Sequence, residues 1–481
     1  MQQNSLKKNV AYNVFRTLMQ IVFPLITFPY ASRVLLPEGI GKVNFASSII
    51  QYFALLGSLG ISTYGIREAA KVRSDKQKFS KTVKEIFYIN CISTIIAYIL
   101  FFVALITVPK FKNYKILLCI TSATILFTTM GLEWIYSALE DFKYITIRSF
   151  IFQCVSLILL FCFVHESDDY VKYAAISVFA NVGSNICNFF YSHNFLVHVT
   201  EKLEIKKHLK PIFILFSKSV AVSVYTMLDT TMLGFMISDR EVGIYSIATK
   251  LIRIMTSLIL AASGVFMPRL SYYVEQKEKN NFQTILSKSL NMTLCFSIPS
   301  VIGFICIAKP IILLIGGPEY IHSIIVMQIM SPLMIVLAIS NFTGMQIFIP
   351  LRKEKYILYS TIAGAIINAI INYLLIPRYG AVGAGTASVV AELVVVFIQF
   401  YFARRYFTFK TLFFPFLQYT IGASCFIFPL LLVQKFITNI LAQIIVGVSS
   451  AIIIYILVLV IFKNEFILTC LKLIKTKRNR S

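Results

Sequence analysis

Residues 67–84 read REAAKVRSDKQKFSKTVK, and residues 85–108 continue directly with EIFYINCISTIIAYILFFVALITV. The first segment carries seven Lys or Arg residues, whereas the second has a single charged residue, at its start. A hydrocarbon core of ~30 Å requires ~20 mostly apolar residues in one helix, so residues 85–108 predict a membrane-spanning helix. Because Lys and Arg resist translocation, the basic segment before it predicts a cytoplasmic loop.

The same alternation of apolar stretches and basic gaps extends along the whole chain. Of its 481 residues, 58% are hydrophobic and only 14% are charged, and yet the formal net charge is +24. A soluble domain is on average roughly 25% charged. We therefore predict an all-α, polytopic membrane protein with about fourteen transmembrane helices. The predicted spans are residues 10–32, 43–66, 85–108, 116–138, 144–164, 171–196, 212–236, 243–266, 288–315, 322–350, 356–376, 381–402, 412–433 and 440–462.

The distribution of basic residues predicts the topology. Twenty-nine Lys and Arg residues fall on the side of the membrane that holds Lys7 and Lys8, and ten fall on the other side. This bias predicts an even number of helices with both termini in the cytoplasm. The N-terminus lacks the short apolar region and cleavage site of a secretory signal, so we expect a retained first helix. The basic loops predict contacts with anionic lipids and no nucleic-acid partner.

A weak internal repeat relates the two halves of the predicted bundle. The segment LLPEGIG at residues 35–41 aligns with ISDREVG at residues 237–243 under a shift of 202, and a shift of 212 aligns the two KYI segments that begin at Lys143 and Lys355. Each unit then has six helices, so the repeat is parallel. We predict a six-helix lobe over residues 1–211, a second over 212–411, and two additional helices with a basic cytoplasmic tail over 412–481. Two such lobes that rock against each other would give alternating access.

Several charged residues lie inside the predicted spans, where each costs ~2.5–3.5 kcal/mol at a helix centre unless it has a partner or a wet cavity. The basic ones are Arg16, Arg148, Lys218, Lys250, Arg253 and Lys288, and the acidic ones are Glu133, Asp229 and Glu392. Lys218 and Lys288 lie close enough to the cytoplasmic side to extend toward it. Glu133 and Arg148 have similar predicted depths, which suggests an ion pair of structural or functional importance.

Lys250 and Arg253 share one helical face with Ser246 and Ser257, at i, i+4, i+7 and i+11. We predict that this face lines a cavity. Asp229 has the same predicted depth as Lys250, roughly 10 Å from the outer side, and a pair between them would leave Arg253 for a ligand.

Arg16 shares a face with Gln20 and either lines the cavity or extends inward. Six basic residues against three acidic ones predict an anionic substrate, such as a phosphate or pyrophosphate headgroup.

Two polar stripes either pack helices together or form a sugar-facing wall. They consist of Asn181, Ser184, Asn185 and Asn188, and of Thr361, Gly364, Asn368 and Asn372. Glu392 lies in the middle of a span with Ser388 and Gln399, and together with Asp229 it is a candidate for ion coupling. The nine cysteines form no C-x-x-C motif and are expected to be small buried packing residues. The five histidines show no metal-ligand spacing and are expected in loops or interfaces. We predict no metal and no cofactor.

The segments PYASRVL (29–35), GIGKVNFA (39–46) and YGIRE (64–68) resemble the N-terminal hairpin of the polysaccharide biosynthesis flippases, and so do DTTMLG (229–234) and VGIYS (242–246) in the second half. These proteins belong to the multidrug/oligosaccharidyl-lipid/polysaccharide exporter superfamily, whose two six-helix lobes match the repeat. The usual Leu-Gly after the first-helix arginine reads Leu35-Leu36-Pro37 here.

The resemblance implies a flippase that moves an undecaprenyl-diphosphate-linked oligosaccharide repeat unit of O-antigen or capsule across the bacterial plasma membrane. It implies a cationic lumen for the diphosphate-sugar headgroup, lined by Arg16, Lys250 and Arg253, with Arg33 at the outer mouth and Arg67 at the inner edge. The lipid tail would stay in the bilayer, and the repeat-unit polymerase is a candidate partner. The alternative is a cation-coupled drug or metabolite antiporter of the same superfamily. An enzyme is not expected, because the sequence has no large catalytic loop and no Walker A motif.

Overall fold

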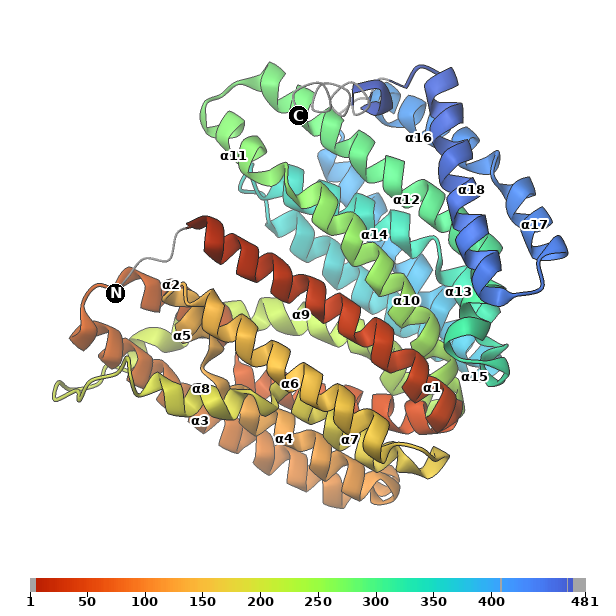
Figure 1. Cartoon of the computed structure of the whole chain (residues 1–481). Helices are drawn as coiled ribbons and strands as arrows, with labels where there is room; N and C mark the ends of the chain where they lie inside the picture. Colours follow the sequence, from red (N-terminus) through yellow and green to blue (C-terminus); the bar gives the residue numbers. More distant parts are fainter. Residues whose placement is uncertain (1–5, 407–408, 465, 470–481) are drawn as a thin grey trace. The chain divides into compact units, whose positions relative to one another are not determined.

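The structure is a computed structural model that describes residues 6–406, 409–464 and 466–469. Within these ranges the regular elements are helices and there is no strand (Figure 1). The predicted all-α fold class is therefore confirmed. The α-helices up to the middle of the chain are α1 (Leu6–Ser58), α2 (Ile61–Lys71), α3 (Lys76–Thr107), α4 (Lys115–Gly131), α5 (Glu133–Ala138), α6 (Phe142–Phe163), α7 (Tyr170–Val178), α8 (Asn185–Ser192), α9 (Lys206–Met236) and α10 (Asp239–Gly264).

The second half continues the all-helical pattern. Its α-helices are α11 (Met267–Glu275), α12 (Lys279–Ile315), α13 (Ser323–Met330), α14 (Leu333–Asn341), α15 (Lys355–Ala403), α16 (Phe409–Ser424), α17 (Ile427–Phe436) and α18 (Ile440–Ile461). Two π-helical turns, η3 (Phe179–Gly183) and η5 (Phe342–Phe348), follow α7 and α14. Short 3₁₀ turns are η1 (Pro109–Tyr114), η2 (Ser167–Asp169) and η4 (Pro318–Tyr320).

Ten helical segments of the described chain are long and apolar enough to cross a membrane. Two of them, residues 11–71 and 355–403, each contain two of the predicted spans. The predicted spans at 171–196 and 212–236 fall on α7–η3–α8 and on α9, which are not among the ten. Every predicted span thus coincides with helix, and the chain is a multi-pass membrane protein.

Three of the long helices contain one residue with non-helical backbone angles, which in α12 is Ile307 with φ −101° and ψ 18°. In α1 the break is at Leu36, whose φ of 60° and ψ of 175° lie in a region that favours glycine. The resemblance implies a glycine at this position, where the chain has Leu36. In α15 the break is at Gly380, with φ 52° and ψ −129°, between the predicted spans 356–376 and 381–402.

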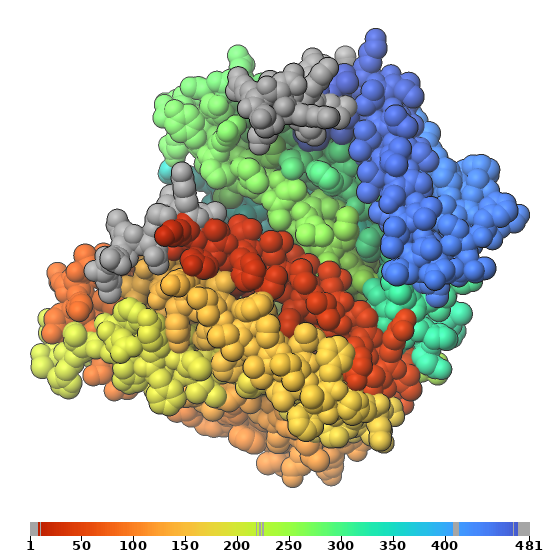
Figure 2. All heavy atoms as spheres, in the orientation of Figure 1, coloured from red at the N-terminus to blue at the C-terminus, as the bar shows by residue number. Residues whose placement is uncertain are grey.

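The chain forms two compact units, residues 1–243 and 244–481. In the first unit α1 packs against α3, α4, α6 and α9, and it lies beside α6 on the surface seen in Figure 2. Because α9 packs against α1 and α2, it belongs to this unit. The boundary between the units therefore follows residue 243, later in the chain than the predicted lobe boundary at residues 211/212. The division into residues 1–211, 212–411 and 412–481 stays a prediction.

Buried polar groups bind α1, α3 and α4 together inside the first unit. The side chains of Asn90 and Ser93 both donate to the carbonyl oxygen of Gly57, at 2.8 and 2.6 Å. Thr94 and Thr129 share a hydroxyl hydrogen bond of 2.5 Å. Between membrane helices such bonds contribute ~0.6–2 kcal/mol each.

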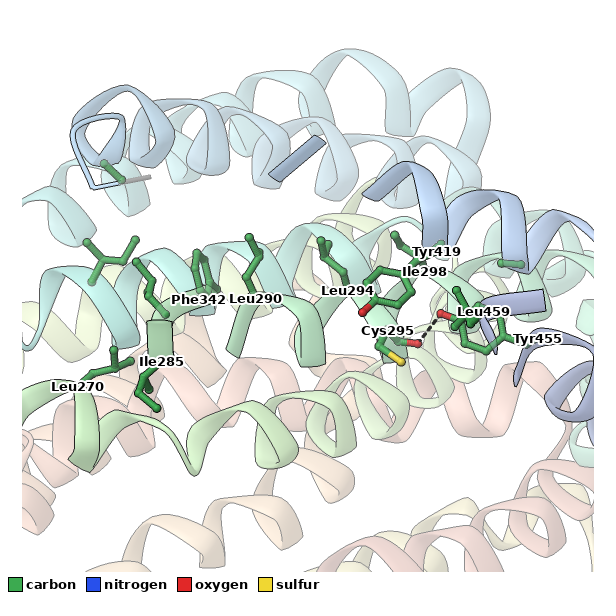
Figure 3. Packing of buried hydrophobic residues seen from close by; sticks show 14 of the residues in the cluster. Leu270, Ile285, Leu290, Leu294, Cys295, Ile298, Phe342, Tyr419, Tyr455 and Leu459 are labelled. Atoms are coloured by element: carbon green, nitrogen blue, oxygen red, sulfur yellow. Dashed lines mark hydrogen bonds between the residues drawn. The ribbon is translucent and has the colours of Figure 1, made fainter. Parts of the chain in front are cut away.

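The second unit has its core around α12, which packs against α13, α14, α16 and α18. Figure 3 shows this cluster, in which Tyr455 donates a hydrogen bond of 2.9 Å to the carbonyl oxygen of Cys295. Of the eight described cysteines, only Cys295 is buried, and Cys119, Cys162, Cys187 and Cys425 are exposed. The expectation of buried packing cysteines was therefore wrong for most of them, because much of each helix surface faces outward. Cys470 lies outside the described residues.

The aligned segments 35–41 and 237–243 lie against each other within the first unit. A Cβ atom on Gly41 would overlap the carbonyl of Asp239, and one on Gly243 would overlap the carbonyl of Pro37. Pro37 and Asp239 are themselves related by the shift of 202 residues, so the two close approaches are reciprocal. Only glycine allows backbones this close.

We expect Gly41→Ala and Gly243→Ala each to destabilise the protein by ~1–3 kcal/mol or more, since backbone must move to make room. The measurement is the thermal unfolding temperature of purified protein in one detergent. Gly303→Ala is the matched control, because its added Cβ would have no atom within 4 Å. Equal stability of all three variants would contradict the close packing.

Candidate functional site

A polar cavity of about 90 Å³ lies inside the first unit, between α1, α5, α6 and the turn from η3 into α8. Its polar lining combines residues from separate helices, which the sequence singled out with the exception of Gln153. They are Arg16 and Gln20 from α1, Glu133 from α5, Arg148 and Gln153 from α6, and Asn181, Ser184 and Asn185 from the η3–α8 region. Here we call it the arginine cavity.

Arg16 and Glu133 form an ion pair at the edge of this cavity, with the Arg16 Nη2 donating to the Glu133 Oε1. Their side chains are 24% and 37% exposed, so neither is fully buried. Between α4 and α5, Leu132 takes a left-handed conformation with φ 44°. This break places Glu133 at the start of α5, opposite α1.

Arg148 is 7% exposed and does not pair with Glu133, which corrects the pair suggested by their similar depths. Its Nη1 instead donates to the carbonyl oxygen of Ser184 at 3.1 Å, and its guanidinium lies 5.8 Å from the centre of the Tyr144 ring. Sequence gives the depth of a residue along a helix, but the partner depends on how the helices are rotated. Here the carboxylate faces Arg16.

Three buried polar atoms around the arginine cavity have no hydrogen-bond partner among the described residues: the Nε atoms of Arg16 and Arg148 and the Oε1 of Gln153. A buried unsatisfied polar group costs ~1–3 kcal/mol. Such a cost is relieved when water or a ligand enters. Both arginine groups are donors in a planar fork that fits phosphate or carboxylate oxygens.

The charged residues that line the cavity are two arginines and one glutamate, so the lining is positive on balance. The π-helical turn η3 contributes Ala180 and Asn181 to the wall. Turns of this kind are frequent at functional sites, because they interrupt the regular hydrogen-bond ladder. The arrangement can therefore hold a small anionic group.

Arg33 and Arg67 are exposed and do not line the arginine cavity. Arg33 lies on α1. Arg67 lies on α2, where its Nε donates to the adjacent Glu68 at 3.0 Å and its guanidinium lies 5.4 Å from the Tyr64 ring centre. Their predicted places at the outer mouth and inner edge of a lumen stay predictions.

Asp229 is buried on α9 in the first unit, while Lys250 and Arg253 lie on α10 in the second. Arg253 is exposed and Lys250 is half-buried. The pair between Lys250 and Asp229 and the cavity role of this face stay predictions.

The polar stripe on the first half of α15 packs inside the second unit. Asn368 and Asn372 are almost fully buried, and Asn372 donates to Asn368 at 3.0 Å. A Cβ on Gly364 would overlap Val395 from the second half of the same helix. These contacts favour helix packing over a sugar-facing wall.

Glu392 is 8% exposed on the second half of α15. Nearby, Ser388 lies 3.3 Å from the hydroxyl of Tyr245, and Gln399 donates to Ser360 at 3.1 Å. Among the residues that the structure describes, no group of three or more His, Cys, Asp or Glu side chains could hold a metal ion.

The first unit contains a second polar cluster that the sequence did not predict. Glu85 is fully buried, and its Oε2 lies 2.8 Å from the Nε2 of His208, whose Nδ1 lies 2.7 Å from the hydroxyl of Tyr64. The backbone N–H of Glu204 donates to Glu85 at 2.7 Å. Because Glu85 and His208 are 123 residues apart, no spacing pattern could have revealed the cluster. His208 is thus a buried connector between α2, α3 and α9.

Comparison with known proteins gives two family matches. The model described as polysaccharide biosynthesis protein matches residues 6–274, and the MatE model matches residues 215–374. The chain is 23% identical to the putative O-antigen transporter of Escherichia coli K12, over 83% of this chain and 97% of that protein. It is 24% identical to the capsular polysaccharide biosynthesis protein CapF of Staphylococcus aureus, over 83% of this chain and 100% of that protein.

Solved structures share the fold. The lipid II flippase MurJ in an inward closed conformation superposes with a TM-score of 0.76 at 18% identity, over 95% of this chain and 100% of that one. An inward-facing multidrug resistance MATE family transporter of the MOP superfamily gives 0.63 at 13% identity, over 82% and 97%. The first family model covers more than half of the sequence. Together with the all-helical fold, this match shows that the chain belongs to the polysaccharide biosynthesis protein family.

Proposed function

We propose that this protein is a flippase that carries a lipid-linked oligosaccharide, an undecaprenyl-diphosphate-linked repeat unit, from the cytoplasmic to the outer leaflet for surface polysaccharide synthesis. The relatives named as O-antigen transporter and capsular polysaccharide biosynthesis protein support this class of cargo. The observation that carries the proposal is the arginine cavity, with two guanidinium groups whose buried Nε donors have no hydrogen-bond partner in the described part of the chain.

The chemistry of the cavity fits a diphosphate better than a neutral sugar. A diphosphate presents several oxygens that accept charge-assisted hydrogen bonds, which are roughly twice as strong as neutral ones. Arg16 and Arg148 would supply the donors, and the amides of Asn181 and Asn185 lie in the same wall. The Glu133 carboxylate already forms an ion pair with Arg16 and would be displaced when the anion binds.

The path across the membrane is also a proposal. Alternating access of the two predicted six-helix lobes would expose the headgroup first to the cytoplasm and then to the outside. Lys250 and Arg253 would bind the headgroup from the second lobe, and Glu392 and Asp229 are the candidates for ion coupling.

The basic loops support a location in the bacterial plasma membrane with both termini in the cytoplasm. We propose no catalytic step, and a repeat-unit polymerase is the proposed protein partner.

The alternative, a cation-coupled antiporter for drugs or metabolites, is represented by the MatE match over residues 215–374. The positive balance of the arginine cavity is unfavourable for a cationic drug. The charge of the lining therefore favours the flippase.

Arg16→Gln and Arg148→Gln should each slow flipping about 10- to 100-fold, because a hydrogen bond to a charged group contributes ~1.5–3 kcal/mol. Arg16→Lys should keep part of the activity, since it retains the charge but loses the fork. The assay follows a fluorescent diphosphate-linked oligosaccharide in proteoliposomes. Arg352→Gln, which removes an exposed arginine paired with Glu275, is the control. Wild-type rates for both cavity variants would disprove their role.

Glu133→Gln should strengthen the binding of an anion, whereas the arginine variants should weaken it. Removing the carboxylate frees Arg16, so the purified protein should bind inorganic pyrophosphate about fivefold more tightly, as expected for a half-exposed ion pair of ~1 kcal/mol. Titration calorimetry measures the affinity, and Glu275→Gln serves as the exposed control. Weaker binding by Glu133→Gln would mean that the carboxylate helps to form the site.

Arg253→Ala tests the predicted contribution of α10. Flipping should fall about 10-fold or more if the guanidinium contacts the diphosphate, and Arg253→Lys should be tolerated only if charge alone matters. Complementation of surface polysaccharide in a flippase-deficient strain gives the readout, with protein amounts in the membrane measured alongside. Full activity of Arg253→Ala at normal amounts would remove this residue from the site.

A further inference from the structure

A second, larger cavity lies wholly within the second unit and shares no residue with the arginine cavity. Its volume is about 970 Å³, and it lies between α12, α16 and the chain that follows α18. This size is at the upper end of the ~300–1,000 Å³ that is typical of pockets for small molecules. Nothing in the proposed transport of the headgroup uses it.

The floor of this cavity is a hydrogen-bonded network of amides that joins three elements. Asn464, only 3% exposed, donates from its Nδ2 to the Oε1 of Gln418 at 2.8 Å. Tyr419 on α16 donates to the Oδ1 of Asn291 on α12 at 3.0 Å. Tyr419 belongs to the buried cluster drawn in Figure 3, so this floor is anchored to the core. The site is therefore built by tertiary packing and does not depend on one flexible loop.

The charge of the lining is positive. Lys288 from α12 and Lys463 from the turn after α18 are the only charged residues among the described lining. Both are exposed, and neither forms an ion pair with a described carboxylate. Lys463 has a left-handed backbone with φ 51° and follows shortly after the end of α18. Two ammonium groups over a polar floor are suited to a phosphate.

The lining of the cavity also includes aromatic rings. Phe266, Phe414 and Phe466 line it together with the polar groups. The basic loops predict that the start of α12, the start of α16 and the end of α18 all lie on the cytoplasmic side. A lysine at this depth lies at the level of the lipid phosphates, and aromatic rings are favourable there because they contact both headgroups and acyl chains.

We propose that this cavity binds the phosphate of an anionic phospholipid from the inner leaflet. Lys288 and Lys463 would contact the phosphate, the amides would hydrogen-bond the headgroup, and the phenylalanines would pack against the glycerol and upper acyl chain. This occupant would bridge α16 and the chain after α18 to α12 through the lipid. It is distinct from the transported lipid, and it does not depend on the proposed function.

The test compares the full-length protein with Lys288→Gln/Lys463→Gln by native mass spectrometry in the presence of phosphatidylglycerol or phosphatidylcholine. Each lysine near a lipid phosphate contributes enough to change affinity about fivefold, so the double variant should bind phosphatidylglycerol about 25-fold more weakly. Phosphatidylcholine, whose choline group offsets the charge of its phosphate, should bind weakly to both forms and should therefore differ much less between them than phosphatidylglycerol. Lys277→Gln/Lys279→Gln is the control, because both lysines are exposed and lie outside the cavity.

Loss of phosphatidylglycerol only in the cavity variant, with an unchanged unfolding temperature in phosphatidylcholine, supports the site. Equal retention by both double variants overturns it. Millimolar inorganic phosphate is the third condition of the test. If it displaces bound phosphatidylglycerol as effectively as excess phosphatidylglycerol does, the ligand is a soluble phosphate and the lipid assignment is wrong.

Discussion

Inside a bilayer no water is available to hydrogen-bond the peptide backbone, so each N–H and C=O group must be satisfied by the protein itself. The helical structure of every predicted span is the direct consequence. Irregular backbone is tolerated at this depth only where protein covers it or where it borders a polar cavity. The break at Leu132 and the π-helical turn η3 both obey this rule, because each lies beside the arginine cavity.

The same constraint explains how the helices adhere. Lipid tails are as apolar as leucine, so burial of apolar surface between helices provides little driving force. Close backbone approach and buried hydrogen bonds take over this role. Gly41 and Gly243 provide the first, and the bonds from Asn90 and Ser93 to the Gly57 carbonyl provide the second. The segments 35–41 and 237–243 are therefore packing motifs, and their glycines allow the two backbones to approach closely.

Charged residues inside the spans are the exceptions to this pattern of apolar, closely packed helices. Arg16, Glu133 and Arg148 come from three helices and meet in one cavity. Their depths along the helices followed from the sequence, and so did the positive balance. Their pairing did not, because the rotation of each helix about its axis decides which side chains meet. The stripe of Asn368 and Asn372 shows the same limitation, since one periodicity fits both a packed face and a cavity wall.

The sequence alone determined the all-helical membrane class and the positions of the spans, because both depend on the length and polarity of local segments. It also determined that cationic groups lie within the spans. Only the tertiary structure decided that Arg16 pairs with Glu133, that Glu85 and His208 form a buried connector, and that Lys288 and Lys463 face a common cavity. These contacts join residues far apart in the chain, and their geometry depends on how complete helices pack.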